Sequence, residues 1–321
     1  MKRIHSVHSL FNAVLLAAVT LAALPAAAEN NYAAASTLRI GSGPDGKLYQ
    51  LLVQDMQTVC GNEVPIVNVP SAGGIPNLMG LSASQLDLGI MQLDTLREIG
   101  RDGDESIQTL QALMPLHTNL LHVLSLRKGS KMGEPNVLLG NTPFDLRNVK
   151  VIQKFSELKG ATIAAVGSTA LLGGRLNDLN NMGMNIRKAE SDEQAIKWLN
   201  ENKVQAIFTD GGWPLPSIER LKSNSGLALV EYDMVPQSPL VVVKRNYQNL
   251  DAFNMRFLGS PNLLMTRPFK PGGELGKRVA ALQSCLLSHL DELQEGHFQA
   301  AWKEIKAPAD TYGIVRFGKG K

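Results

Sequence analysis

Short polar turns that follow apolar runs are the residues of this sequence best able to bind a ligand. Four of these turns are Gly41-Ser42-Gly43, Ser71-Ala72-Gly73-Gly74, Gln92-Leu93-Asp94 and Gly167-Ser168-Thr169. Glycine lets a ligand approach the main chain closely, and the first N–H groups of a helix have no partner inside the helix. Because the helix dipole adds positive character there, such turns favour capture of an anion without any catalytic side chain.

Two further patterns lie later in the chain. Gly173-Gly174-Arg175 could present a guanidinium to a carboxylate, and Gly211-Gly212-Trp213-Pro214 could place an aromatic ring over a ligand. Each has a plain alternative: a helix start with a surface arginine, and a core tryptophan beside a tight turn. Gly41-x-Gly43-x-x-Gly46 matches a dinucleotide fingerprint by spacing, but Pro44 and Asp45 would disturb a phosphate turn.

Alternating strands and helices must position these turns. Apolar runs predict strands at 38–40, 64–69, 86–91, 161–166 and 204–208, with further strand structure between 230 and 243. Helical spacing of apolar residues predicts helices at 48–59, 74–85, 192–199 and 277–293, and another after Thr169. In an open α/β sheet the carboxyl ends of the strands and the helix N-termini line one crevice. The sequence therefore predicts an α/β fold in which two similar halves direct their turns into a shared cleft.

The first 28 residues have the pattern of a secretory signal peptide. Lys2 and Arg3 precede an apolar run from 14 to 24, and Ala26-Ala27-Ala28 offers small residues for cleavage. The run is shorter than the roughly 20 residues that a membrane span needs. An uncleaved anchor is the alternative. We predict cleavage after about Ala28 and a mature protein free in the periplasm.

Composition and motifs argue against several classes of function. Without Lys2 and Arg3 the chain has 30 basic and 29 acidic residues, a net charge of about +1, and no dense basic stripe, so we do not expect a nucleic-acid partner. The histidines lack metal-ligand spacing, and no hydrolase motif occurs. We therefore expect no metal, no cofactor and no enzymatic activity. An exported enzyme on this scaffold is the least favoured hypothesis.

Cys60 and Cys285 are the two cysteines of the chain. In an oxidising compartment they could form a disulfide that closes a very long loop, or they could remain a free buried pair. Neither has the Cys-x-x-Cys spacing of a redox site. The residues alone leave both alternatives open.

The order and spacing of several segments resemble the TAXI group of solute-binding proteins, the extracytoplasmic receptors of certain TRAP transporters. The segments are Leu38–Gly43 with Tyr49, Ser71–Leu78, Gln85–Asp94, Leu121–Val123, Glu157–Gly160 and Thr209–Pro214. The resemblance runs from about Leu38 to Ile305. This chain departs from it at Asp45, at Leu93 and at Ser168-Thr169-Ala170-Leu171-Leu172, and residues 128–155 look like a loop-rich insertion.

The resemblance implies a two-lobed type II periplasmic-binding-protein fold with a hinge and a central cleft. Residues 36–127 and 256–321 would form lobe 1, and residues 128–255 lobe 2. The return of the chain to lobe 1 could bring Cys60 and Cys285 together. The residues expected to bind the ligand are Ser42, Gly43, Tyr49, Ser71, Gly73, Gly74, Gln92, Ser168, Thr169, Arg175, Gly212 and Trp213.

The resemblance also implies capture of a small anionic or zwitterionic solute, such as glutamate, a related amino acid or a dicarboxylate, for a TRAP-type permease. The altered turns and the insertion at 128–155 leave a second hypothesis open. In it, the chain is a binding-fold protein that acts as a sensory or interaction partner of a membrane or envelope complex.

Overall fold

The structure is a computed structural model that describes residues 37–101, 105–132, 138–139, 142–143, 147–270, 272–305 and 311–318. The predicted signal peptide, residues 1–28, lies outside the described residues, as does most of the segment from 133 to 146. The chain from Thr37 onward forms one compact unit. Within its described part, no helix is both long and apolar enough to cross a membrane.

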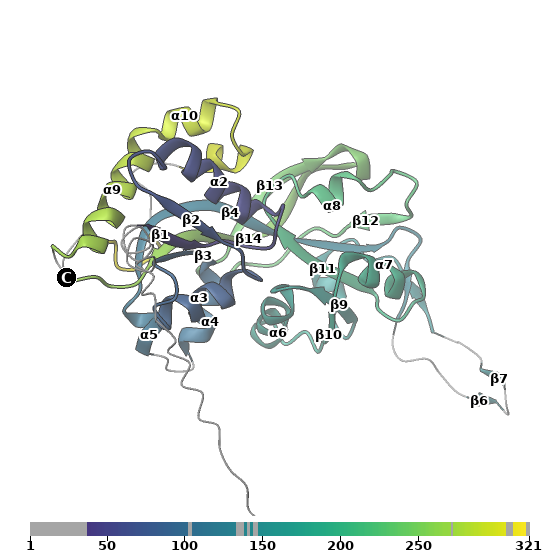
Figure 1. Cartoon of the computed structure of the whole chain (residues 1–321). Coiled ribbons are helices and arrows are strands. Elements are labelled where there is room, and N and C mark those ends of the chain that lie inside the picture. Colours follow the sequence, from purple (N-terminus) through teal and green to yellow (C-terminus); the bar gives the residue numbers. More distant parts are fainter. Residues whose placement is uncertain are drawn as a thin grey trace, which may run out of the picture. The chain divides into compact units, whose positions relative to one another are not determined.

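Ten of the described strands form one mixed sheet (Figure 1). Their spatial order is β10-β9-β11-β4-β14-β3-β1-β2, with β12 paired to β4 and β13 paired to β14. The strands are β1 (Leu38–Gly41), β2 (Ile66–Val69), β3 (Leu88–Gln92), β4 (Gln111–Leu126), β9 (Thr162–Val166), β10 (Asn185–Ala189), β11 (Ala206–Gly211), β12 (Leu227–Leu229), β13 (Val241–Tyr247) and β14 (Ala252–Thr266). Two short ladders pair β5 (Ser130–Lys131) with β8 (Val149–Lys150), and β6 (Leu138–Leu139) with β7 (Thr142–Pro143).

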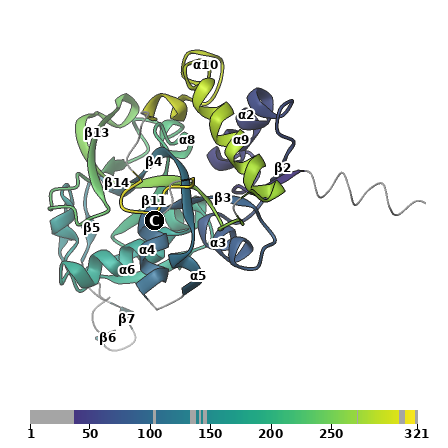
Figure 2. The same cartoon turned by 90° about the vertical axis from the view of Figure 1, so that its left-hand side faces the viewer.

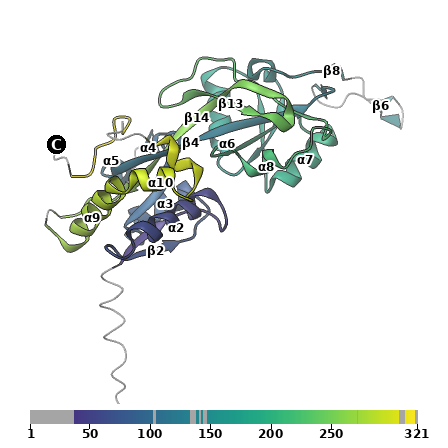
Figure 3. The ribbon, with the colours of Figure 1, turned by 90° about the horizontal axis from the view of Figure 1, so that it is seen from above.

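The sheet has a parallel group at each end and two long antiparallel strands between them. β1, β2 and β3 are parallel to one another, and so are β9, β10 and β11. β4 and β14 pair with each other, and each also pairs with the end of one parallel group, β4 with β11 and β14 with β3. Figure 3 shows these two strands running from the side of α2, α9 and α10 to the side of α6, α7 and α8.

The helices that cover the sheet follow the apolar spacing of the sequence. Those of the first and last segments are α2 (Leu48–Cys60), α3 (Gly74–Ser82), α4 (Leu93–Arg101), α5 (Glu105–Gln108), α9 (Glu274–Ser288) and α10 (Leu290–Glu295). Those of the middle segment are α6 (Thr169–Leu179), α7 (Asp192–Asn200) and α8 (Pro216–Glu219). Short 3₁₀ turns are η1 (Phe155–Leu158), η2 (Gln248–Leu250) and η3 (Ala300–Glu304). α7 has a side-chain N-cap: the Ser191 hydroxyl accepts a hydrogen bond from the Gln194 N–H.

Four buried clusters divide the apolar residues into two groups. Two clusters contain residues up to Leu116 and from Leu263 onward, including the face of α9 at Val279, Leu282 and Leu286. The other two contain residues between Leu120 and Leu258. β4 and β14 are the strands that contribute to both groups. The molecule thus has separate cores on either side of the middle of these strands.

Cys60 and Cys285 are joined by a disulfide, so the structure has the bonded one of the two alternatives. Cys60 ends α2 and Cys285 lies in α9, and these helices pack side by side (Figure 2). The Cα atoms of the two cysteines are 6.0 Å apart.

Most predicted elements are present, and the differences have local causes. The predicted helix at 277–293 is two helices, because α9 ends at Ser288 and α10 begins at Leu290 after the non-helical His289. The strand structure expected from Val230 begins only at Val241. β4, β10 and β14 were not predicted as strands: polar residues interrupt β10, and β4 and β14 each pass from one core group to the other.

Candidate functional site

Strand ends from the two core groups meet at one polar junction. Gln92 ends β3, Asp210 lies near the end of β11, and Ser168 follows β9 at the start of α6. The Gln92 Nε2 donates to Asp210 Oδ2 at 2.7 Å. The Ser168 Oγ lies 3.2 Å from Gln92 Oε1 and 3.2 Å from Asp210 Oδ2. The predicted convergence of Gln92 with Ser168 is therefore present, and Asp210 joins them.

Two helix N-termini are directed to the same junction. α6 begins one residue after Ser168. α3 begins at Gly74, where an added Cβ would lie 3.7 Å from the Gln92 main-chain nitrogen. Both helices thus bring the positive end of a dipole to the junction.

The junction also carries buried negative charge. Burial raises the pKa of Asp210 to about 6, and the charge of Asp94 pushes it in the same direction. Burial likewise raises the pKa of Asp94, whose Oδ1 accepts a hydrogen bond from the Ser260 hydroxyl. Asp94 lies in α4, two residues after Gln92 at the end of β3. The carboxylates of Asp94 and Asp210 therefore both lie at strand ends. Keeping two acids in such surroundings costs stability, which is typical of functional sites.

Arg175 approaches this acidic region from α6. Its side chain is 10% exposed, and its Nε lies 3.6 Å from Glu98 Oε2 of α4. Its Nη1 is buried and has no hydrogen-bond partner. The positive charge of Arg175 acts to lower the pKa of Asp94, against the larger effect of burial. Glu98 pairs with Arg175 through Nε and leaves Nη1 over, so the role of Arg175 as an anion ligand stays a prediction.

Tyr49 belongs to a second polar network beside the junction. Its hydroxyl donates to Asn262 Oδ1 and accepts from Asn119 Nδ2. Asn119 Oδ1 in turn lies 2.8 Å from His117 Nε2. Burial raises the pKa of Tyr49, with added effects from Asp210 and Asp94, and burial lowers the pKa of His117 to about 4. These groups are neutral near pH 7 and lie where β4 and β14 pass between the two core groups.

Asn77 holds together the turns that carry Ser42 and Ser71. It is fully buried in α3, and its Nδ2 donates to the carbonyl oxygens of Ser42 at 2.7 Å and Ile90 at 2.9 Å. Its Oδ1 lies 2.8 Å from Ser71 Oγ. The Ser42 hydroxyl donates to Asn68 Oδ1 at 2.6 Å. Both predicted serines therefore bond inside the protein and shape the turns.

An Asn77→Ala substitution should lower the free energy of unfolding by about 2 to 4 kcal/mol, because it removes two buried hydrogen bonds, to the carbonyl groups of Ser42 and Ile90. Urea unfolding followed by circular dichroism measures this. Met79→Ala is the matched control, since Met79 lies in the same helix and is 66% exposed; it should change stability by less than about 0.5 kcal/mol. Equal effects of the two substitutions would contradict the role given to Asn77.

The other predicted residues lie at varying distances from the junction. The Thr169 hydroxyl bonds to the carbonyl groups of Val166 and Phe208 and fixes β9 to β11. The Trp213 ring packs on Arg245 and donates to the Asn246 carbonyl, so it is not brought to Gln92. An added Cβ at Gly212 would collide with Leu48 and approach His117, which places that turn against the start of α2. Gly43 and Gly73 support the Ser71 turn through main-chain hydrogen bonds.

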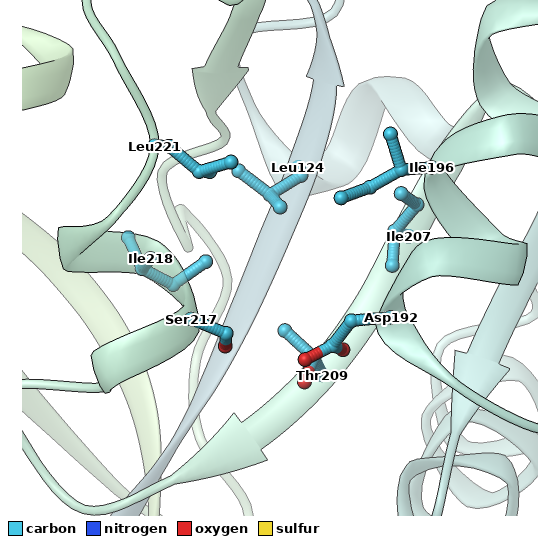
Figure 4. Close-up of a pocket in the computed structure, with 8 residues that line it drawn as sticks. All are labelled: Leu124, Asp192, Ile196, Ile207, Thr209, Ser217, Ile218 and Leu221. Carbon is cyan, nitrogen blue, oxygen red and sulfur yellow. The ribbon is translucent and has the colours of Figure 1, made fainter.

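Two cavities elsewhere in the described chain are alternatives. Figure 4 shows the smaller one between α7, α8, β4 and β11, where Asp192, Thr209 and Ser217 face five aliphatic side chains. Its volume of about 10 Å³ holds one water molecule at most. A groove of about 330 Å³ is lined by exposed charged residues such as Arg127, Lys154 and Asp251. Neither includes any predicted ligand-binding residue.

The residues expected from the sequence to bind the ligand did not include Asp94, Glu98 or Asp210, although Asp94 belongs to one of the turns selected there. Asp94 and Asp210 follow strands by the same rule that selected Gln92, so the signal was present. Glu98 had no signal, because its place opposite Arg175 depends on how α4 and α6 pack. Among the described residues, no group of three His, Cys, Asp or Glu side chains could hold a metal ion.

Comparison with known proteins shows the fold. No protein-family model matches the chain, and no curated protein matches it. The chain is similar to the structure of Tv2483 bound to L-arginine, at 13% identity and a TM-score of 0.50, covering 83% of this chain and 90% of that one. A periplasmic binding protein of an arginine transport system from Legionella pneumophila gives 14% identity and a TM-score of 0.45, covering 84% and 99%. The GluR0 ligand-binding core in complex with L-glutamate gives 15% identity and a TM-score of 0.47, covering 81% of this chain and 96% of that one.

The chain therefore has the mixed α/β, two-lobed fold of periplasmic binding proteins. This confirms the fold class that the sequence predicts.

Proposed function

We propose that the chain is an extracytoplasmic solute-binding protein that holds a small zwitterionic or anionic solute, above all an amino acid, at the junction of Gln92, Ser168 and Asp210. One observation carries the proposal: polar strand ends from both core groups contact one another directly beside the N-termini of α3 and α6. A ligand carboxylate suits the helix N-termini, and a ligand ammonium suits Asp94 and Asp210. The likeness to a protein bound to L-arginine makes amino acids the first solutes to test.

We further propose the lobes expected from the sequence, residues 36–127 with 256–321 and residues 128–255, joined through β4 and β14, each of which also packs against residues of the second lobe. The division of the buried residues into two core groups supports this arrangement. In such a protein the shared strands form the hinge, and the lobes close on the solute.

The finer assignments rest on the sequence. Export to the periplasm with cleavage after about Ala28, membership of the TAXI group, and delivery to a TRAP-type permease are proposals supported by the signal-like N-terminus and the matching segments. The absence of catalytic activity is part of the same proposal.

A sensory or interaction role is the second candidate. It is favoured by the fact that Gln92, Ser168 and Asp210 already bond to one another, so the lobes can close without a solute. In that role the closed protein would dock on a membrane sensor or envelope complex. Pull-down of such a partner from membranes, without any solute response, would support it.

A thermal-shift screen of amino acids and dicarboxylates tests the proposed function. A solute that binds only the folded state stabilises it by about 2.7 kcal/mol at 100 times its Kd, so Tm should rise by several degrees. Gln92→Ala should abolish the shift, because it removes an amide that would contact the solute at the junction, whereas Thr58→Ala on the exposed face of α2 should keep it. No shift with any member of a broad panel would contradict the proposal.

A further inference from the structure

The charges around the junction do not balance. The junction contains three carboxylates, those of Asp94 and Glu98 in α4 and of Asp210 in β11. Among the residues that the structure describes, the positively charged side chain near them is Arg175 of α6. Asp94 is buried, at 4% exposure, Asp210 is half-buried, and their negative charges repel each other. When all four groups are ionised, the formal charge is −2.

Arg175 shows that this region is built for a further polar partner. Its side chain is nine-tenths buried, yet Nη1 has no hydrogen-bond partner and Nε meets Glu98 only at 3.6 Å. A buried guanidinium with donors left over is costly unless another acceptor reaches it. One acceptor, such as the carboxylate of an amino acid, would complete it. A second carboxylate on the same solute would lie near the carboxylates of Glu98, Asp94 and Asp210, which would repel it.

We propose that the site selects a solute with a net positive charge, an amino acid with a cationic side chain, and that Glu98 sets this selectivity by pairing with Arg175. The inference rests on the proposed function and narrows it. The cationic group would offset the surplus charge of Asp94 and Asp210, while a dicarboxylate or an acidic amino acid would be repelled. Glu98 would not contact the solute itself. It would determine specificity by pairing with the Arg175 guanidinium, which it orients, and by adding negative charge to the site.

Calorimetric titration with three amino acids of similar length tests the proposal: L-arginine, L-glutamine and L-glutamate, which carry net charges of +1, 0 and −1. The wild-type protein should bind arginine at least tenfold more tightly than glutamine, and glutamate most weakly, because like charges in a buried site oppose binding strongly. Glu98→Gln should free Arg175 and raise the affinity for glutamate relative to arginine at least tenfold. Glu190→Gln, at an exposed position before α7, is the control and should leave the order unchanged.

Each outcome decides between the claims. If glutamate binds wild type more tightly than arginine, or if Glu98→Gln leaves the glutamate-to-arginine ratio unchanged, the charge inference is wrong while the solute-binding proposal stands. If none of the three amino acids binds, the charge inference is wrong, and the thermal-shift panel alone decides the solute-binding proposal. Circular dichroism of Glu98→Gln shows whether the variant is folded, and a salt titration gives a second readout, since added salt should narrow the preference for arginine in the wild type.

Discussion

Reduction of the Cys60–Cys285 disulfide should lower the free energy of unfolding by up to about 5 kcal/mol, the upper end of what chain entropy gives for so long a loop. The two cysteines are 225 residues apart in the sequence, so the bond restricts most of the unfolded chain. It joins α2 to α9, the helix that brings the C-terminal part of the chain back to the first core group. Both sulfur atoms lie in that core, with exposed fractions of 0% and 3% for the residues.

Urea unfolding of oxidised and reduced protein, with a thiol-blocking reagent after reduction, measures the effect. A variant with Cys60→Ala and Cys285→Ala should resemble the reduced wild type and should not respond to reductant, which makes it the control. Because the disulfide is buried, we expect it to resist reduction in the native state. The protein is therefore reduced in denaturant. Equal stability of the oxidised and reduced proteins would contradict the stabilising role of the bond.

Asp210→Asn should stabilise the solute-free protein above pH 7 and abolish solute binding. In the folded protein burial raises the pKa of Asp210 to about 6 from an ordinary value of 3.8, so the folded state prefers the protonated carboxyl. The stability that protonation contributes is complete below about pH 4 and is lost as the pH rises through 6. The difference of about two units corresponds to at most about 3 kcal/mol. Asparagine keeps an acceptor for Gln92 and removes the buried charge.

The measurement is a set of unfolding curves from pH 4 to pH 8. The variant and the wild type should have nearly equal stability at pH 4, and the variant should gain by about 1 to 3 kcal/mol by pH 8. Asp291→Asn, on the exposed face of α10, is the control and should show no such divergence. A variant that is less stable than wild type at pH 8, or that still binds the solute, would show that Asp210 is a structural residue.

The fold was largely predictable from the sequence because local signals agreed with one another. The apolar runs before Gly41 and Gly167 and the helical spacing from Leu48 to Val59 mark elements that the structure contains as β1, β9 and α2. Strand-end logic also placed Gln92 and Ser168 correctly, since that logic depends only on the topology of parallel strands. β14 escaped prediction, because a strand whose two halves belong to different cores has no single apolar pattern.

The site was predictable only in part, since it depends on contacts between distant segments. Arg175 was selected for its charge, but the sequence does not show that Glu98 of another helix pairs with it. Ser42 and Ser71 have the right residue type, yet Asn68 and Asn77 bond to them inside the protein. Trp213 was expected to place an aromatic ring over a ligand, and in the structure its ring packs on Arg245. Except for Asn77, which is six residues from Ser71, each partner lies more than twenty residues away in the sequence.

The site residues hold one another in this structure, which sets a condition on binding. A solute must replace the hydrogen bond between Gln92 and Asp210, and it must offset the cost of the charge on Asp210. A solute ammonium does both, because it donates to Asp210 and pairs with its charge. Closure around the solute would then exchange contacts within the protein for contacts through the ligand.

Hydrogen exchange with and without a solute from the screen tests the central claim most directly. If the solute lies at the junction, the amides at residues 168–170, 73–75 and 211–213 should exchange more slowly in its presence, while those lining the groove near Arg127 and Lys154 should be unchanged. Protection confined to that groove, or a bound solute that protects none of the three segments, would contradict the assignment of the binding site.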